Sequence, residues 1–128
     1  MNSHSKADQL HPEAQKGIEL FNRGDFYKAH DPLELAWMKT RPPERDLYQG
    51  ILLIGLAYYQ ISLGNYRGAI KMFKKGQQRL NILGDNLLGV NLIKLRTDAE
   101  IVEHAIRHLG PKHLHDLDQE LIKPVPLT

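Results

Sequence analysis

The segment that decides the fold is Phe21-Asn22-Arg23-Gly24-Asp25-Phe26-Tyr27-Lys28-Ala29, whose pattern returns 40 residues later as Ile61–Ala69 (ISLGNYRGA). Each copy contains a glycine, then an Asp or Asn, then an aromatic residue, and three residues further on an alanine. A helix that ends at such a turn and is followed directly by another helix forms a helical hairpin. The repeat therefore predicts two hairpins, with Gly24, Gly64, Asn65 and Gly68 as turn residues.

Helical spacing of apolar residues continues on both sides of the repeat. The third predicted helix has apolar residues on every side, so we expect it to be the most buried element. The fifth is capped by Asn91 and ended by Gly110-Pro111. The predicted helices span about residues 12–23, 26–39, 44–63, 66–83 and 92–109.

These elements predict an all-α fold, a five-helix bundle of two hairpins with a C-terminal helix and an extended tail. The hairpin pattern resembles tetratricopeptide-like repeats, although its period is longer. We expect a flexible N-terminus over residues 1–11, one helical domain over 12–110, and an extended tail over 111–128. The tail prediction rests on Pro124 and Pro126, which fix their own backbone and favour extended residues before them.

Composition excludes several classes of protein. A chain of 128 residues fits one domain, and the absence of cysteine excludes thiol catalysis, disulfides and Cys-ligated metals. The N-terminus lacks the apolar run of a secretory signal. The uncharged stretch 47–66 contains four Gln, Ser or Asn residues and the Gly64-Asn65 turn, so we expect no membrane span. A cytoplasmic protein is the expected result.

The strongest candidate site is His30-Asp31-Pro32-Leu33-Glu34-Leu35-Ala36-Trp37. His30 and Glu34 are four residues apart on one helix face, with Trp37 close to that face. Such a pair can ligate a metal ion, or act as a base with its orienting group. The same residues also fit a new helix that begins at this point, with Asp31 as its N-cap and Pro32 in its first turn. A kink at Pro32 is expected under either interpretation. We favour a structural His–Glu pair, and keep a metal-dependent hydrolase as the alternative.

A second cluster consists of the histidines near the C-terminus. His104 and His108 are four residues apart, and His113 and His115 follow. They supply enough nitrogen ligands for zinc or nickel. Histidines are also favourable at helix C-termini, where they face water, and we favour that interpretation.

A basic stripe occupies the outer face of the fourth predicted helix. Its members are Arg67, Lys71, Lys74, Lys75 and Arg79. RNA binding through this face is the second alternative function. No aromatic residues are interleaved with the cations, and the formal net charge is only +2, so a solvated helix face is favoured over nucleic-acid binding.

The ordered motifs resemble the domain-of-unknown-function family 309 over about residues 14–109. The residues that carry the resemblance are Phe21-Asn22-x-Gly24-x-Phe26-x-x-Ala29-His30-x-x-Leu33-Glu34-x-x-Trp37, Leu47-Tyr48-Gln49-Gly50, Gly64-Asn65-x-x-Gly68-Ala69 and Gly89-Val90-Asn91-Leu92 with Leu95-Arg96. The resemblance implies a small all-helical fold and a shared polar cluster, without an established activity. It places the family's characteristic positions on His30, Glu34, Trp37, Gln49, Gly64, Asn65 and Gly68.

This chain departs from the family pattern at three positions. Pro32 is not usual there, Gln60 stands where a His is usual, and Leu53 stands where a Gln is usual. The last two changes reduce the number of possible ligands opposite His30 and Glu34, which weakens the metal hypothesis.

Together these observations predict a small non-enzymatic binding module without a cofactor. Its polar pocket is expected to be formed by His30, Glu34, Trp37, Gln49 and Gln60, and to bind a protein or a small ligand. A homodimer is a further possibility, because the apolar face of the fifth helix suits a self-pairing seam as well as burial within the chain. The residues of that face are Leu92, Leu95, Val102 and Ile106.

Overall fold

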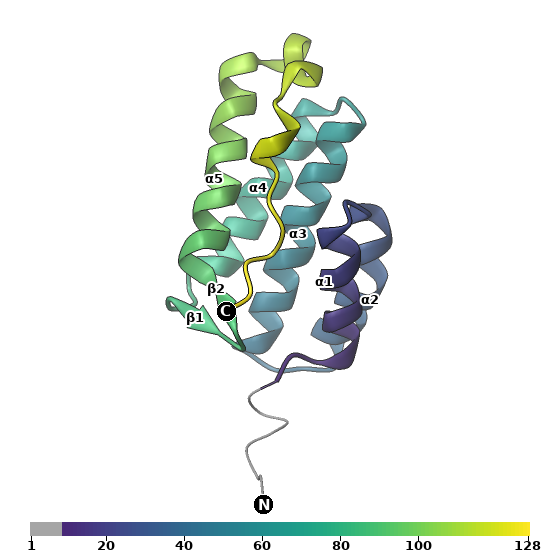
Figure 1. The fold of residues 1–128 in the computed structure, drawn as a ribbon, viewed down its shortest axis with the longest axis vertical. Helices are drawn as coiled ribbons and strands as arrows, with labels where there is room; N and C mark the ends of the chain where they lie inside the picture. Colours follow the sequence, from purple (N-terminus) through teal and green to yellow (C-terminus); the bar gives the residue numbers. More distant parts are fainter. Residues whose placement is uncertain (1–8) are drawn as a thin grey trace, which may run out of the picture.

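The computed structural model describes residues 9–128 and confirms the all-α class (Figure 1). Two short strands precede the last α-helix, and two 3-10 helices follow it. The elements are α1 (Pro12–Asn22), α2 (Phe26–Met38), α3 (Glu44–Ser62), α4 (Tyr66–Leu80), β1 (Asn86–Leu87), β2 (Val90–Asn91), α5 (Leu92–Leu109), η1 (Pro111–Asp116) and η2 (Gln119–Leu121). Within this part of the chain, no helix combines the length and the apolar character that crossing a membrane requires. Of the predicted flexible segment 1–11, residues 1–8 lie outside the described residues.

The repeated turn has the same backbone geometry in both hairpins. Gly24 and Gly64 have φ of 85° and 73°, in the left-handed region that glycine tolerates. In the second turn the Asn65 side chain accepts a 3.0 Å hydrogen bond from the amide of Gly68. Asp25 occupies the matching position but makes no such side-chain bond. The Gly-Asp/Asn signal therefore predicts the turn correctly, while its capping bond forms only in the second copy.

Replacing Gly64 by alanine is expected to lower the free energy of unfolding by about 1–2 kcal/mol, because a Cβ is strained at positive φ. No heavy atom lies within 4 Å of the position that this Cβ would take, so backbone strain is the only local penalty. Gly84 is equally open but does not have a positive φ, and serves as the matched control. Chemical denaturation of both alanine variants measures the difference, and equal stabilities would contradict the prediction.

An aromatic cluster joins the two hairpins in the core. The Tyr58 ring of α3 lies with its centroid 5.9 Å from that of Phe21, 5.4 Å from Phe26 and 5.8 Å from Phe73. These rings come from α1, α2 and α4 and meet Tyr58 in edge-on arrangements, which aromatic pairs favour. Tyr58 is only 2% exposed. The third helix is thus the central element, as its apolar character predicts.

Burial raises the pKa of Tyr58, and the charge of Asp98 raises it further. Unfolded tyrosine ionises near pH 10, whereas the folded state keeps Tyr58 protonated, so stability present below pH 10 is lost above it. The Tyr58→Phe variant should avoid about 1 kcal/mol of the loss that the native chain shows between pH 10 and pH 11. Denaturation at these two pH values tests this, and an identical loss in both chains would refute it.

Three helical glycines allow close helix contacts. A Cβ on Gly50 would lie 2.5 Å from Leu80 Cδ2, and one on Gly76 would lie 2.8 Å from Ile54 Cδ1. Both positions are at the contact between α3 and α4, and Gly17 plays the same part for Leu33 between α1 and α2. These helix pairs therefore approach more closely than larger side chains would allow.

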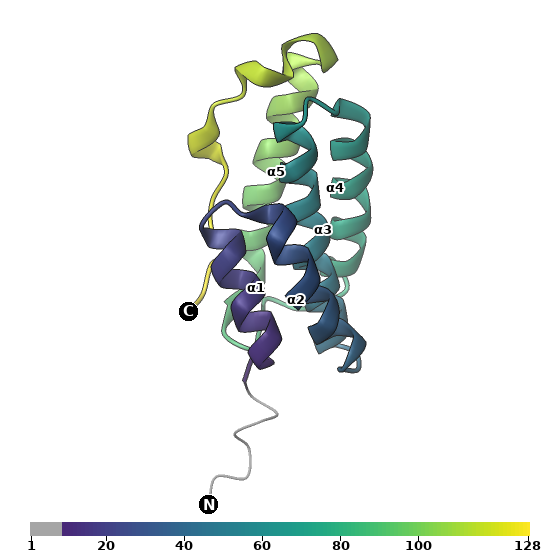
Figure 2. The ribbon, with the colours of Figure 1, turned by 90° about the vertical axis from the view of Figure 1, so that its right-hand side faces the viewer.

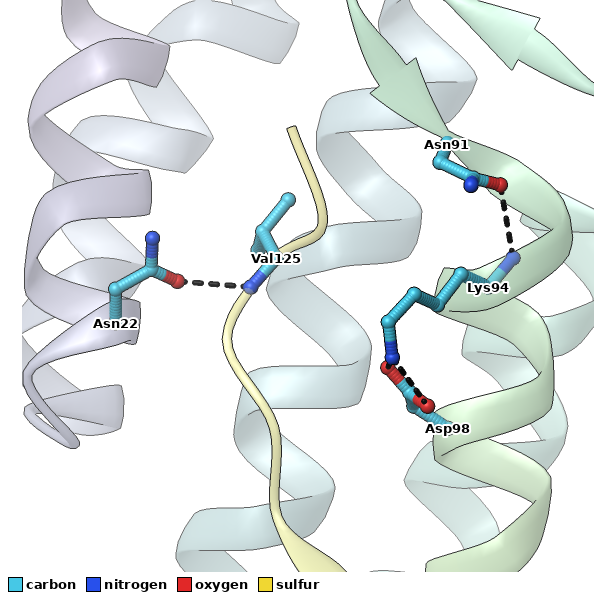
Figure 3. Close-up of polar contacts among 5 residues, drawn as sticks. All are labelled: Asn22, Asn91, Lys94, Asp98 and Val125. Atoms are coloured by element: carbon cyan, nitrogen blue, oxygen red, sulfur yellow. Dashed lines mark hydrogen bonds and ion pairs between the residues drawn. The ribbon is translucent and has the colours of Figure 1, made fainter. Parts of the chain in front are cut away.

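The C-terminal segment is packed against the bundle. It contains η1 and η2 where the sequence predicts an extended tail, because Leu114 and Leu117 turn inward and are buried. From residue 122 onward it is extended, as its prolines predict, and it runs back along the bundle (Figures 1 and 2). The Val125 amide donates to Asn22 Oδ1 of α1 at 2.8 Å (Figure 3). The tail thereby connects the first hairpin to the last helix.

The apolar face of α5 is directed into the chain. Asn91 caps this helix by accepting from the Lys94 amide at 3.0 Å, as predicted (Figure 3). Its seam residues are at most 3% exposed, namely Leu92, Leu95, Val102 and Ile106. Of the two uses left open for this face, the structure therefore shows burial within the chain.

Candidate functional site

One face of α2 carries three of the five predicted pocket residues, His30, Glu34 and Trp37, together with Tyr27, which was not predicted. Tyr27, His30, Glu34 and Trp37 follow one another at spacings of 3, 4 and 3, which places them on one side of the helix. Both ends of this row meet α3: the rings of Tyr27 and Tyr59 are 5.2 Å apart, and the Arg45 guanidinium lies 5.4 Å from the Trp37 ring centroid. His30 and Glu34 therefore face the flank of α3.

The structure brings His30 and Glu34 together without a hydrogen bond between them. His30 Nε2 lies 3.9 Å from Glu34 Oε2, and His30 Nδ1 lies 3.7 Å from Asp31 Oδ1. The side chains of His30 and Glu34 are 35% and 44% exposed. Across residues 9–128, no group of three or more His, Asp or Glu side chains is arranged to hold a metal ion. The pair is therefore a solvent-accessible polar patch without a third ligand.

Pro32 lies inside a continuous helix. The restart predicted at Asp31-Pro32 does not occur, because α2 runs unbroken from Phe26 to Met38. A proline has no amide proton, so Pro32 donates no helical hydrogen bond. Leu33 and Ala36 are buried in the core, and their packing stabilises the helix on the C-terminal side of the proline. His30 and Glu34 consequently share one helix face on either side of the proline.

Trp37 has an unusual polar environment. Its indole Nε1 is buried and has no hydrogen-bond partner among the described residues. A buried donor without an acceptor is destabilising, so this N–H does not explain why a tryptophan is present. The ring instead offers area to Arg45, which lies over it.

Gln49 lies in a surface groove on α3. This α3 groove has a volume of about 540 Å³ and is lined by Gln49, Leu53, Lys75, Gln78 and Arg79. Lys75, Gln78 and Arg79 belong to α4, so α4 supplies both cations of the groove. Helix α3 packs against both α2 and α4 (Figure 2). Gln49 and Leu53 are four residues apart and therefore share one face of α3. This face is next to the one from which Arg45 and Tyr59 contact α2. His30 and Glu34 thus border the side of α3 opposite Lys75 and Arg79.

The two cations of the groove differ in their pairing. Arg79 Nη1 lies 3.5 Å from Asp46 Oδ1, and the Asp46 side chain is only 12% exposed. This pair partly neutralises Arg79. Lys75 is exposed and forms no ion pair within residues 9–128. Among the described residues, the groove therefore presents one positive charge without an ion-pair partner, beside the amides of Gln49 and Gln78 and the apolar side chain of Leu53.

Gln60 is separate from this groove. Its Oε1 accepts a 2.8 Å hydrogen bond from Asn65 Nδ2 and thereby braces the turn between α3 and α4. A Cβ at position 68 would lie 2.6 Å from Asn65 Nδ2, which explains the glycine there. Gln60 is thus placed as a turn residue, because it stands in the last turn of α3 where the next helix begins.

The other two predicted clusters lie on the surface. All members of the basic stripe are exposed: Arg67, Lys71, Lys74, Lys75 and Arg79. His104 and His108 are exposed and line a shallow cavity of about 460 Å³ together with Asp116 and Asp118. His113 and His115 both approach Asp116, at 3.6 Å each.

Sequence reasoning missed a cavity that is larger than the α3 groove. It has a volume of about 700 Å³ and lies where α1 and α3 begin, lined in part by Leu10, His11, Arg41, Glu44 and Tyr48. Tyr48 is adjacent to Gln49 in the sequence, but nothing in its spacing reveals that it meets the N-terminal end of α1. Contacts between segments so far apart have no local sequence signal.

Comparison with known proteins gives a family and one relative. Residues 14–72 match the family model described as Domain of unknown function (DUF309), which confirms the expected resemblance over that part of the chain. An uncharacterized protein of Aquifex aeolicus (strain VF5) is 30% identical over 99 residues, which are 77% of this chain and 29% of that protein. The aligned region thus spans less than one third of the relative. The DUF309 match includes most of α1, all of α2 and α3, and the start of α4, but ends before Lys75 and Arg79.

Proposed function

We propose that the DUF309 segment, completed by the rest of α4, is a non-enzymatic binding module for an acidic protein segment. The observation that supports this is the α3 groove. Among the described residues Lys75 has no ion-pair partner there, and the charge of Arg79 is only partly neutralised by Asp46. A carboxylate of the partner would bind Lys75, and an apolar side chain beside it would cover Leu53. The amides of Gln49 and Gln78 would bond the partner's polar groups.

The α2 side would orient the partner. Glu34 and Asp31 lie beside His30 and give this side a different charge from the α4 side. A partner helix with acidic residues along one edge and hydrogen-bond donors along the other would place its acids beside α4 and its donors beside α2. Only one orientation of the partner helix allows both contacts. Charge complementarity of this kind sets orientation and association rate more than affinity.

A charge reversal in the groove tests the proposal. The probe is a helical peptide of Glu, Leu and Ala with a fluorescent label, and its binding is followed by anisotropy. Lys75→Glu should weaken binding about fivefold to tenfold, because attraction becomes repulsion at an exposed site. Lys74→Glu makes the same charge change one residue away, outside the groove lining, and should have less than half that effect on the binding free energy.

Trp37 supplies an independent signal. It is the only tryptophan of the chain and lies under Arg45 of α3, one helical turn before Gln49, so its emission reports on the contact between α2 and α3 without a label. Binding of the acidic peptide should change this emission, and the change should be lost in Lys75→Glu but kept in Lys74→Glu. Equal effects of the two variants, or no binding by the unmodified chain, would reject the α3 groove as the docking site.

A further inference from the structure

The cavity lined by His11 and Tyr48 lies apart from the α3 groove and shares none of its lining residues. We call it the basal cavity, because its lining residues come from the starts of α1 and α3 and from the end of α2. These helix ends lie at the same end of the bundle (Figures 1 and 2). Its volume of about 700 Å³ is in the range of small-molecule sites. It is therefore large enough for a ligand of roughly ten to twenty heavy atoms.

Tyr48 provides a hydrogen-bond donor in the wall of this cavity. Its hydroxyl accepts a 2.8 Å bond from the His11 amide and, within residues 9–128, donates to no acceptor. Burial and the nearby charge of Glu44 raise the pKa of Tyr48, although the His11 amide opposes them. The phenol therefore stays protonated at neutral pH and can donate to a ligand.

His11 contributes a second donor. Its Nδ1 accepts a 3.0 Å bond from the amide of Glu13, which caps α1. A neutral imidazole that accepts at Nδ1 carries its proton on Nε2. The cap thus fixes a tautomer in which the other nitrogen of this cavity-lining residue is a donor.

The charges around the basal cavity favour an anion. Lys39 and Arg41 line it, are exposed, and form no ion pairs among the described residues, whereas Glu44 is the single acid of the lining. The N-terminal ends of α1 and α3, which carry partial positive charge, reach the same place. The C-terminal end of α2 also lies at this cavity, but its Leu35 and Ala36 carbonyls already accept hydrogen bonds from the Lys39 amide.

The balance of charge and surface selects the kind of anion. Two cations against one acid leave a single excess positive charge, which suits a monoanion better than a phosphate. Leu10 and Pro12 add apolar surface to the same wall. We propose that the basal cavity binds a small organic carboxylate with a short apolar body.

The probe for this proposal is 4-phenylbutanoate, titrated into the ¹⁵N-labelled chain and followed by amide chemical shifts. We expect saturable shifts at His11, Thr40, Arg41 and Tyr48. The neutral amide analogue of the same shape should bind about tenfold more weakly, since it lacks charge-assisted hydrogen bonds. Inorganic phosphate should bind more weakly than 4-phenylbutanoate.

Two double variants test whether binding depends on the positive charge at the basal cavity. Lys39→Gln with Arg41→Gln should weaken 4-phenylbutanoate binding about tenfold, and both side chains are exposed, so the fold should survive. Lys112→Gln with Lys123→Gln removes the same charge elsewhere on the surface and should leave the affinity unchanged. Equal binding of the acid and its amide, tighter binding of phosphate, unchanged affinity in the first double variant, or shifts outside this end of the bundle would each overturn the proposal. Its failure would leave the α3 groove untouched, because no lining residue is shared.

Discussion

The Tyr58→Ala variant is expected to lose about 3–5 kcal/mol of unfolding free energy, the cost usual for removing a buried aromatic ring. Tyr58 touches aromatic rings from α1, α2 and α4 at once, so its removal opens a void where both hairpins meet. Chemical denaturation with extrapolation to water measures the loss.

The matched control is Tyr58→Phe at neutral pH. The Tyr58 ring lines a surface pocket, and none of the side-chain hydrogen bonds within residues 9–128 involves its hydroxyl, so removing that hydroxyl should change stability by less than about 1 kcal/mol. A small loss for both variants would show that the aromatic cluster does not join the hairpins. A loss for Phe as large as that for Ala would assign the stabilisation to the hydroxyl.

The second large effect is expected between Gly50 and Leu80. Gly50→Ala should destabilise the chain by about 1–3 kcal/mol, even though alanine is the better helix former, because its Cβ would overlap Leu80 Cγ and Cδ2 at 2.7 and 2.5 Å. Leu80→Ala alone should cost about 2–5 kcal/mol, since Leu80 is fully buried.

The two changes should be strongly coupled. In the double variant the new methyl group occupies space that Leu80 has left, so the loss should be smaller than the sum of the single losses by at least about 1 kcal/mol. A double-mutant cycle by denaturation measures this coupling. Additive losses would contradict the close approach of α3 and α4 at Gly50.

The helices were predictable because their boundaries have local causes. The Gly-Asp and Gly-Asn turns, the Asn91 cap and the Gly110-Pro111 stop each act within a few residues of the helix end that they define. The sequence could not predict the hydrogen bond between Asn22 and Val125, which joins residues 103 positions apart. The same applies to the inward packing of Leu114 and Leu117, since their partners come from distant segments.

The candidate site was predictable only in part. The helical period correctly places His30 and Glu34 on one face, because that relation is internal to one helix. Gln49 and Gln60 both suit a polar pocket by residue type, but only the groove lining of α3 and α4 distinguishes them. Lys75 shows the converse: its sequence context is a solvated stripe, and its place in the groove depends on how α4 packs on α3.

The central claim is that the α3 groove binds an acidic segment, and the most direct measurement is a residue-resolved titration. The ¹⁵N-labelled chain would be titrated with the Glu, Leu and Ala peptide, and separately with a version in which lysine replaces glutamate. We predict that the acidic peptide shifts the amides of Gln49, Leu53, Lys75 and Gln78 and the indole N–H of Trp37, and that the basic peptide does not. Shifts confined to α1 or α5, or the same response to both peptides, would contradict the claim.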